Sequence, residues 1–219
     1  MQLSEKTKNN LKGVMPITKE EREDALASAC MQVKRVLPEF TTKFQNAYSE
    51  NRILPSNRQR GVDDGILDGG GSGLPMNMAG GTVLLKAAEI QMQDFLHRIE
   101  QKICVDHHDM GFLYTPSCVA GYKLTGSGTG KRAALLAADQ LKSRFQEKGE
   151  FIQAWGAMGE PENYRLIIDC LLNVPLLYWA SQETGDESYR QIADRHVHTT
   201  LENVIRPDFS TWHTFFLIR

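Results

Sequence analysis

Residues 165–180 read Arg165-Leu-Ile-Ile-Asp-Cys-Leu-Leu-Asn-Val-Pro-Leu-Leu-Tyr-Trp-Ala180 and are apolar at nearly every position. A helix that is apolar on all its faces is normally buried. The run therefore predicts a buried helix over residues 162–183, bent at Pro175 because proline removes one internal hydrogen bond. The run carries a single acidic group, Asp169, in otherwise apolar surroundings.

An ionised carboxylate in apolar surroundings costs free energy unless it is paired or hydrogen-bonded. Burial raises the pKa of a carboxyl group, which suits a residue that must accept and release protons near neutral pH. Asp169 is therefore the first candidate catalytic residue. A helix N-cap, or an acid satisfied by a neighbouring helix, would account for the same residue without catalysis.

Five further segments show the apolar spacing of amphipathic helices. They are residues 18–37, with Thr18 as the expected cap, and residues 83–104, 116–124, 131–147 and 187–205. Strand signals are weak, since only residues 111–114 and 150–155 could form short extended pieces. We therefore predict an all-α chain.

Three of the expected helices share a short motif. The matching stretches are Lys86-Ala-Ala-Glu89, Leu136-Ala-Ala-Asp139 and Ile192-Ala-Asp194. Thr-Gly pairs at 125–126 and 184–185 precede the second and the third of them. A recurring unit of two helices cannot bury its apolar face alone, so its copies must stack. The sequence thus predicts an array of αα-hairpins, either an open solenoid or a closed toroid.

The composition limits the location and the partners of the protein. The 219 residues suffice for one domain, 1–219, and the net charge of −2 gives no electrostatic signature of a nucleic-acid or membrane partner. No apolar run reaches membrane-spanning length, and Met1–Lys8 lacks the hydrophobic stretch of a signal peptide. The scattered cysteines predict reduced thiols of a cytoplasmic protein rather than a disulfide or zinc framework. They are Cys30, Cys104, Cys118 and Cys170.

Residues 51–82 break the helical pattern. Eight glycines fall between Gly61 and Gly81, and no apolar periodicity is left in this segment. A flexible linker would explain the composition. A loop of this length is nevertheless unusual inside a compact domain, which marks the segment as irregular.

The stretch Asp106-His-His-Asp-Met-Gly-Phe-Leu-Tyr114 is the second cluster of chemically active side chains. The apolar run after the acid predicts that Asp109 is held rigidly. A solvated polar turn is one alternative. A metal site is another, but adjacent histidines usually point apart, and positions i and i+2 of a helix diverge. Its ligands would be His107, His108 and Asp109, joined by His196, His198 or His213.

Two further residues could contact a ligand. Trp155 lies between Gln153 and Gly156 in a loop-like context, and a flat indole face suits stacking on a sugar ring. A purely structural tryptophan is the alternative. His213 is a polar residue in the aromatic stretch Ser210-Thr-Trp-His-Thr-Phe215, where core packing and ligand contact are equally compatible with the sequence.

Four motifs, in this order along the chain, resemble those of the unsaturated glucuronyl hydrolases, glycoside hydrolase family 88. The resemblance extends over residues 84–216, with a weaker match over 18–50. It implies an (α/α)6 toroid of helical hairpins and removal of an unsaturated uronic acid from the non-reducing end of oligosaccharides made by polysaccharide lyases. The motifs are Asp106-His-His-Asp-Met-Gly-Phe-Leu-Tyr-Thr-Pro-Ser117, Phe151-Ile-Gln-Ala-Trp-Gly156, Tyr164-Arg-Leu-Ile-Ile-Asp-Cys-Leu-Leu-Asn173 and Ile205-Arg-Pro-Asp208.

The resemblance also implies roles for individual residues. Asp169 matches the general acid/base of the family, and Asp109 matches its second essential acid. His108, Trp155 and His213 match positions that contact the substrate, an unsaturated uronate-containing di- or oligosaccharide. In the implied reaction an acid protonates C4 of the C4=C5 vinyl ether, water attacks C5, and the hemiketal opens. The reaction needs neither a metal nor an organic cofactor.

The chain departs from the family pattern in two places. Glycine-rich residues 51–82 replace a tryptophan-bearing helical segment, and the chain stops at Arg219 where the family continues for another half of the toroid. We therefore expect a truncated toroid, with a doubtful reading frame over 51–82 and the last three residues. Translating the source DNA in the other frames tests this hypothesis. Uncovered helix faces favour association, which predicts a poorly soluble and nearly inactive polypeptide.

Two rival functions remain. An unsaturated rhamnogalacturonyl hydrolase would have a similar toroid, although the run His107-His-Asp-Met-Gly-Phe112 favours the glucuronyl type. A non-catalytic helical-repeat scaffold is the other rival. A scaffold would tolerate replacement of Asp169 by asparagine, whereas the hydrolase hypothesis requires that this change abolish turnover in a full-length version.

Overall fold

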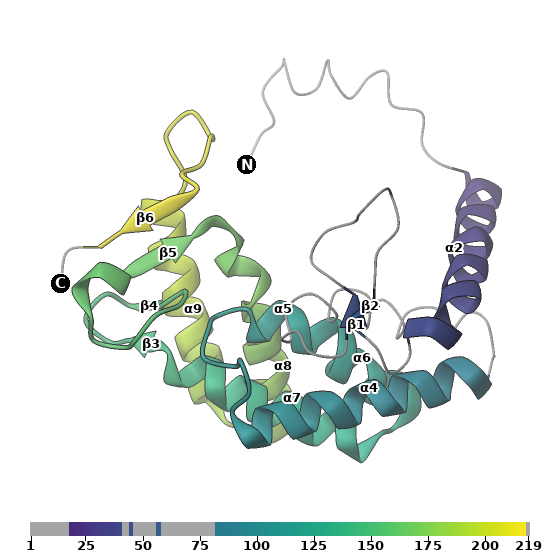
Figure 1. Ribbon diagram of the computed structural model, residues 1–219. Helices are drawn as coiled ribbons and strands as arrows, with labels where there is room; N and C mark the ends of the chain where they lie inside the picture. The colour runs from purple at the N-terminus through teal and green to yellow at the C-terminus, as the bar shows by residue number, and fades with distance from the viewer. Residues whose placement is uncertain (1–17, 41–43, 46–55, 58–81, 218–219) are drawn as a thin grey trace.

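The computed structural model describes residues 18–40, 44–45, 56–57 and 82–217 (Figure 1). Most of these residues are helical, which confirms the predicted class. The α-helices are α2 (Lys19–Phe40), α4 (Thr82–Gln101), α5 (Met110–Tyr114), α6 (Ala120–Thr125), α7 (Gly128–Ser143), α8 (Val174–Thr184) and α9 (Glu187–Asn203). Three shorter helical turns are the π-helix η1 (Thr115–Val119) and the 3-10 helices η2 (Pro161–Asn163) and η3 (Ile168–Leu172).

The described strands form three antiparallel pairs of two strands each. They are β1 (Phe44–Gln45) with β2 (Ser56–Asn57), β3 (Phe145–Gln146) with β4 (Phe151–Ile152), and β5 (Arg165–Ile167) with β6 (Thr214–Phe216). The third pair shapes the candidate site, because it sets Arg165 opposite Phe216 and Ile167 opposite Thr214.

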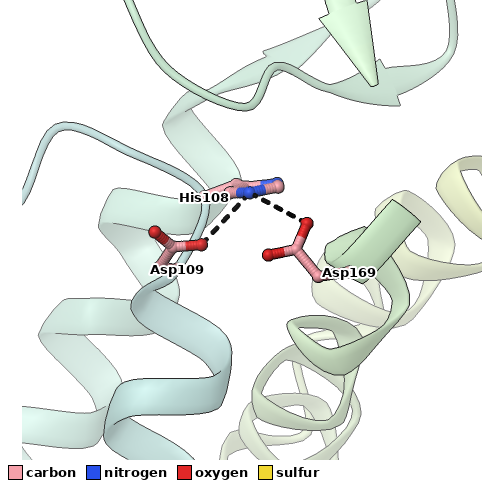
Figure 2. A group of neighbouring side chains, drawn as sticks. All are labelled: His108, Asp109 and Asp169. Carbon is pink, nitrogen blue, oxygen red and sulfur yellow. Dashed lines mark ion pairs between the residues drawn. The ribbon is translucent and has the colours of Figure 1, made fainter. Parts of the chain in front are cut away.

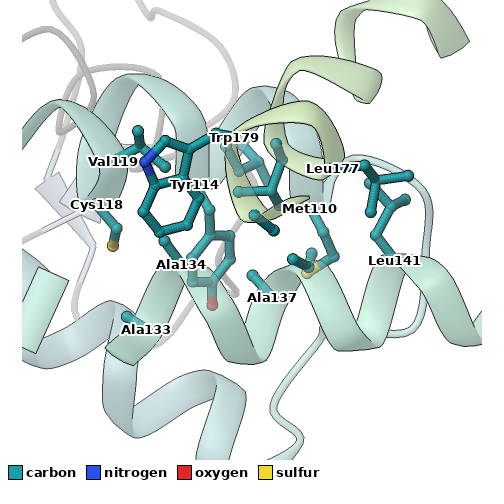
Figure 3. Close-up of a cluster of buried hydrophobic side chains, with 14 of the residues drawn as sticks. Met110, Tyr114, Cys118, Val119, Ala133, Ala134, Ala137, Leu141, Leu177 and Trp179 are labelled. Carbon is teal, nitrogen blue, oxygen red and sulfur yellow. The ribbon is translucent and has the colours of Figure 1, made fainter. Parts of the chain in front are cut away.

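The core is built around α7, against which α4, α5 and α8 pack. Small side chains on the buried face of α7 let the neighbouring helices approach closely. Larger side chains from those neighbours fill the space, among them Met110 and Tyr114 of α5 and Trp179 of α8 (Figure 3). The fully buried small residues of α7 are Ala133, Ala134, Ala137 and Ala138.

The predicted cap at Thr18 is confirmed. Its Oγ1 accepts a hydrogen bond from the backbone N–H of Glu21 at 3.2 Å, and the Glu21 carboxylate accepts one from the backbone N–H of Thr18 at 2.8 Å. This reciprocal arrangement is a capping box, which satisfies two N–H groups that the first turn of a helix leaves free.

The repeat that the Thr-Gly pairs predicted is confirmed at the ends of α6 and α8. Gly126 and Gly185 end these helices with φ of 75° and 77°, in the left-handed region that favours glycine. The hydroxyls of Thr125 and Thr184 each donate to the carbonyl four residues earlier, at 2.7 Å. Each also accepts a backbone N–H from two residues later, at 3.2 Å. The connections that follow α6 and α8 therefore have the same backbone conformation at glycine and the same pattern of hydrogen bonds.

Two predictions about local structure were wrong. Residues 111–114 were expected to be extended, but they lie within the helix α5. Residues 162–183 do not form one bent helix: η2, β5 and η3 precede α8, which begins only at Val174. Pro175 lies in the first turn of α8, where its missing N–H removes no helical bond. The extended piece expected at 150–155 is confirmed in part as β4.

Most of the irregular segment 51–82 lies outside the described residues, apart from Ser56–Asn57 and Thr82. The hypothesis of a doubtful reading frame there stays a prediction, as it does for the last three residues. None of the described helices combines the length and the apolar character that a bilayer crossing requires.

Candidate active site

His107, His108 and Asp109, from the second cluster of chemically active side chains, lie immediately before α5. Asp109 is the residue immediately before this helix, and His108 before it is buried, with 1% of its surface exposed. The backbone N–H of His108 donates to the carbonyl of Ala154 at 2.7 Å, next to Trp155. The loop that bears Trp155 is thereby joined to the segment that bears the acid.

A close contact between α5 and the start of α8 brings the two aspartates together. The buried side chain of Asn173 accepts a hydrogen bond from the backbone N–H of Phe112 at 2.9 Å. A Cβ atom on Gly111 would lie only 2.1 Å from the Cα and carbonyl oxygen of Asn173, so glycine alone permits this approach. Asn173 directly follows η3, which carries Asp169, and Gly111 lies just after Asp109.

The acid pair shares one imidazole (Figure 2). His108 Nε2 lies 3.1 Å from Oδ1 of Asp109 and 3.6 Å from Oδ1 of Asp169. One nitrogen of the histidine and one oxygen of each acid all lie within 4.8 Å of one another. The structure thus assembles three of the predicted site residues in one cluster, called here the acid cluster: His108, Asp109 and Asp169.

Several buried polar atoms of the acid cluster are available to a ligand. Both ring nitrogens of His108, and Oδ1 of Asp109 and of Asp169, form no hydrogen bond of acceptable geometry with the described residues. Buried polar atoms are rarely left without such bonds in folded proteins. Their concentration at one point is typical of a site that a bound molecule completes.

Asp109 is held in its ionised form. Burial raises the pKa of its carboxyl group, but the interactions with His107 and His108 on either side outweigh burial and hold the pKa well below its ordinary value. His107 Nδ1 lies 3.2 Å from Asp109 Oδ2. Asp109 is therefore an anion at neutral pH and is not a proton donor there.

His196, a candidate metal ligand in the sequence, has a structural role instead. Its Nδ1 accepts a hydrogen bond from the backbone N–H of Ile152 at 3.1 Å, and burial lowers its pKa to about 3. The proposed ligand His198 is exposed and lies 3.2 Å from Glu202. Among the described residues, the side chains that lie close enough together to hold a metal ion are those of the acid cluster. The ligand set expected from the sequence, which included a histidine at position 196, 198 or 213, is a different one. The prediction that no cofactor is needed stays a prediction.

Trp155 borders the acid cluster. Its ring stands edge-on to the ring of His108, with the centroids 6.3 Å apart, and 45% of the residue is exposed. The guanidinium of Arg165 lies 4.8 Å from the centre of the indole ring. A partly exposed indole beside the acids is compatible with stacking on a sugar, so this role stays a prediction with geometric support.

The backbone of His213 lies beside the acid cluster, while its side chain is exposed. Its carbonyl accepts a hydrogen bond from the backbone N–H of Ile168, the residue before Asp169, at 2.9 Å. The imidazole Nδ1 lies 2.9 Å from Thr214 Oγ1. Of the two alternatives for His213, core packing is therefore wrong, and contact with a substrate stays a prediction.

The surroundings expected for Asp169 were partly wrong. The residue lies on η3 rather than inside an apolar helix, and 38% of its side chain is exposed. The reason is that β5 pairs with β6, so residues 165–167 extend along a strand and the helix starts later. This arrangement places the carboxyl group beside Asp109 instead of in the core.

Sequence reasoning missed the residues that hold this arrangement. Asn173 carried no signal beyond its place in an apolar run. Arg144, a fully buried arginine that contacts the carbonyl groups of Asp106 and Gly156, looked like an ordinary charge at a helix end. Neither contact could be read from local patterns, because each joins segments that are distant in the sequence.

Fold and site together define a protein of helical hairpins that carries a histidine-bridged acid pair. No protein-family model matches the sequence. An unsaturated chondroitin disaccharide hydrolase from Streptococcus pneumoniae is 42% identical over 200 residues, which cover 91% of this chain and 50% of that protein.

Solved structures show the same similarity. The crystal structure of an unsaturated glucuronyl hydrolase from Streptococcus agalactiae matches with a TM-score of 0.90 and 38% identity, over 98% of this chain and 54% of that one. A variant of this enzyme complexed with dGlcA-GalNAc6S matches with a TM-score of 0.79 and 32% identity, over 94% and 49%. By sequence and fold, the chain is a relative of the unsaturated glucuronyl hydrolases, which have an α/α toroid fold. It spans about half the length of the relatives it matches.

Proposed function

We propose that this chain carries the acid pair of a hydrolase that removes a 4,5-unsaturated uronic acid from the non-reducing end of lyase-generated oligosaccharides. The acid cluster carries the proposal, because two carboxyl groups there share one buried imidazole. The similarity to unsaturated glucuronyl and chondroitin disaccharide hydrolases supports the same reaction and favours it over rhamnogalacturonyl hydrolysis.

In the proposed reaction Asp169 gives a proton to C4, and the electrons of the C4=C5 double bond form the new C–H bond. Positive charge develops at C5, where the ring oxygen stabilises it. A water molecule adds to C5 and returns one proton to Asp169. The resulting hemiketal opens and releases the remaining sugar, so one water is consumed and the acid is regenerated. This is general acid–base catalysis, without attack on the anomeric carbon that ordinary glycosidases use.

The other residues have complementary roles in this proposal. Asp109, with its lowered pKa, stays negative and supports the positive charge that develops in the sugar ring. His108 lies between the two acids with its Nε2 close to both carboxylates, and its ring nitrogens, which form no hydrogen bond with the described residues, bind the substrate. Trp155 and His213 contact the sugar from the border of the acid cluster.

An unsaturated chondroitin-type disaccharide is the proposed substrate, supported by the structural relative that is complexed with dGlcA-GalNAc6S. The proposed location is the cytoplasm. Cys104, Cys118 and Cys170 are free thiols, and reduced cysteines are typical of that compartment.

The test is an assay that follows the ultraviolet absorbance of the unsaturated uronate, which disappears on hydration. We expect Asp169→Asn to abolish turnover, because an amide cannot transfer the proton. Because the chain spans about half of its relatives, disaccharide binding is measured alongside by calorimetry. Binding by the chain, with turnover that Asp169→Asn removes, supports the proposal.

The matched control is Asp24→Asn, a change at an exposed aspartate of α2. It should leave binding and turnover unchanged. In a full-length version of the protein, measurable turnover that Asp169→Asn leaves unchanged would refute the proposed role of this acid. A chain that binds no unsaturated disaccharide would refute the substrate.

A further inference from the structure

Arg144 follows the last turn of α7 and is fully buried. Its guanidinium donates to the carbonyl oxygens of Gln153 at 3.0 Å, Asp106 at 3.0 Å and Gly156 at 3.1 Å. The same group also forms an ion pair with the Asp106 carboxylate. A buried charge is costly unless hydrogen bonds satisfy it, and the planar fork of arginine suits several acceptors at once.

Gln153 extends this network along the same loop. Its buried side-chain amide donates to the carbonyl oxygens of Trp155 and Gly156, each at 3.1 Å, and of Ala157 at 3.2 Å. Its Oε1 accepts a hydrogen bond from the side chain of Gln146 at 2.7 Å. Two buried side chains thus fix the carbonyl groups on both sides of Trp155.

The same network reaches the acid cluster. Arg144 binds Asp106, two residues before His108, and the backbone N–H of His108 donates to Ala154, one residue before Trp155. The loops that bear His108 and Trp155 are therefore joined at two points. Their rings meet edge-on at 85°.

We propose that Arg144 and Gln153, together the carbonyl clamp, are positioning residues that hold Trp155 at a fixed place and angle relative to His108. Neither residue touches the substrate, and both act through the loop backbone. The consequence for binding rests on the proposed function, because it assumes that a sugar stacks on Trp155. The fixed geometry of the indole itself does not depend on that function.

The experiment uses the full chain with Arg144→Lys and Gln153→Met. Lysine keeps the charge but cannot donate to several carbonyl groups in a plane, and methionine removes the three donations to residues 155–157. The first readout is the indole N–H resonance of Trp155, assigned through Trp155→Phe. The second is the calorimetric affinity for an unsaturated chondroitin disaccharide.

Both variants should shift or broaden the Trp155 resonance and leave that of Trp179, which is buried in the core, unchanged. Affinity for the disaccharide should fall about tenfold, the size expected from misplacing one well-oriented contact. The control is Arg195→Lys. Arg195 contacts Glu147 and Glu150 of the same β3–β4 hairpin from the outside, so its replacement should change neither readout.

The clamp is refuted if folded variants keep the wild-type Trp155 resonance, or if the Trp179 resonance changes to the same degree, which would indicate general loosening. An altered Trp155 resonance with unchanged affinity would support the positioning role but refute its consequence for binding, because the sugar would then not stack on Trp155. Should Arg144→Lys fail to fold, Gln153→Met decides alone. Absence of disaccharide binding by the wild type would count against the proposed function, while the indole resonances would still decide whether the clamp fixes Trp155.

Discussion

The helical hairpins and the acid-bearing segment 164–173 are organised by different kinds of contact. The helices that end at Gly126 and Gly185 are ended by hydrogen bonds between residues that are only a few positions apart in the sequence. In segment 164–173, by contrast, β5 is held by its pairing with β6. Asn173, which follows η3, is held by a hydrogen bond that its side chain accepts from the backbone of α5. Local contacts thus build the scaffold, and contacts between distant segments place the acids on it.

The largest expected effect is at the contact between α5 and Asn173. A Cβ added in Gly111→Ala would meet backbone atoms at 2.1 Å, and backbone cannot move aside as a flexible side chain does. We expect a loss of about 3 kcal/mol in the free energy of unfolding, near the upper end for overpacked sites. Asp109 and Asp169 should also separate, with loss of disaccharide binding. Urea denaturation and calorimetry measure the two effects.

Gly128→Ala in α7 is the matched control, since a Cβ there meets nothing within 4 Å among the described residues. It should be neutral or slightly stabilising, because alanine restricts the unfolded chain. Equal stability of the two variants would show that α5 and Asn173 are not held as closely as described.

The next effect is a loss of stability in acid that involves His196, which connects α9 to β4. Its pKa is lowered from 6.5 to about 3 in the fold, so between these values the unfolded chain binds a proton that the folded chain does not. Stability should therefore decrease as the pH falls below 6.5, by about 2 kcal/mol at pH 5 from this group, at 1.4 kcal/mol per pH unit. Denaturation at several pH values measures this dependence.

The variant His196→Gln removes the titrating group. It should be less stable at pH 7, where the wild type benefits from the neutral buried ring, and should show a flatter pH dependence between 6.5 and 5. A wild-type slope in this variant would assign the acid sensitivity to another group.

The smallest expected effects lie in the hairpins. Gly126→Ala and Gly185→Ala place a side chain at φ of 75° and 77°, with no described atom within 4 Å of the new Cβ. Only backbone strain is then introduced, which costs about 1 kcal/mol at each position. Because the two helix ends have the same backbone conformation and hydrogen bonds, the thermal denaturation midpoints of the two variants should fall by similar amounts. A clear difference between them would weaken the idea of a structural repeat.

Sequence patterns predicted the scaffold well and the site only in part. The cap at Thr18 and the repeated stops at Gly126 and Gly185 were readable because each depends on neighbouring residues. His108 and Asp109 could be placed together because they are adjacent. Their meeting with Asp169 was an inference from family resemblance, and the short 3-10 helix that carries Asp169 was not foreseen.

Arg144 shows why the remainder could not be predicted. A charged residue at the end of an amphipathic helix normally faces solvent, and nothing in the adjacent sequence indicates otherwise. Its burial is explained only by the carbonyl groups of Asp106, Gln153 and Gly156, which the fold gathers around it.

The sequence by itself determined the helical class, the repeated helix ends and the residue types from which an acid site could be built, because periodicity and capping act over a few positions. Only the tertiary structure decided that the side chains of His108, Asp109 and Asp169 lie together in one cluster and that Trp155 borders this cluster. Those distances are set by the contact at Gly111, the β5–β6 pair and the carbonyl clamp. Each of these joins segments that lie far apart along the chain, so their geometry follows from packing rather than from local sequence.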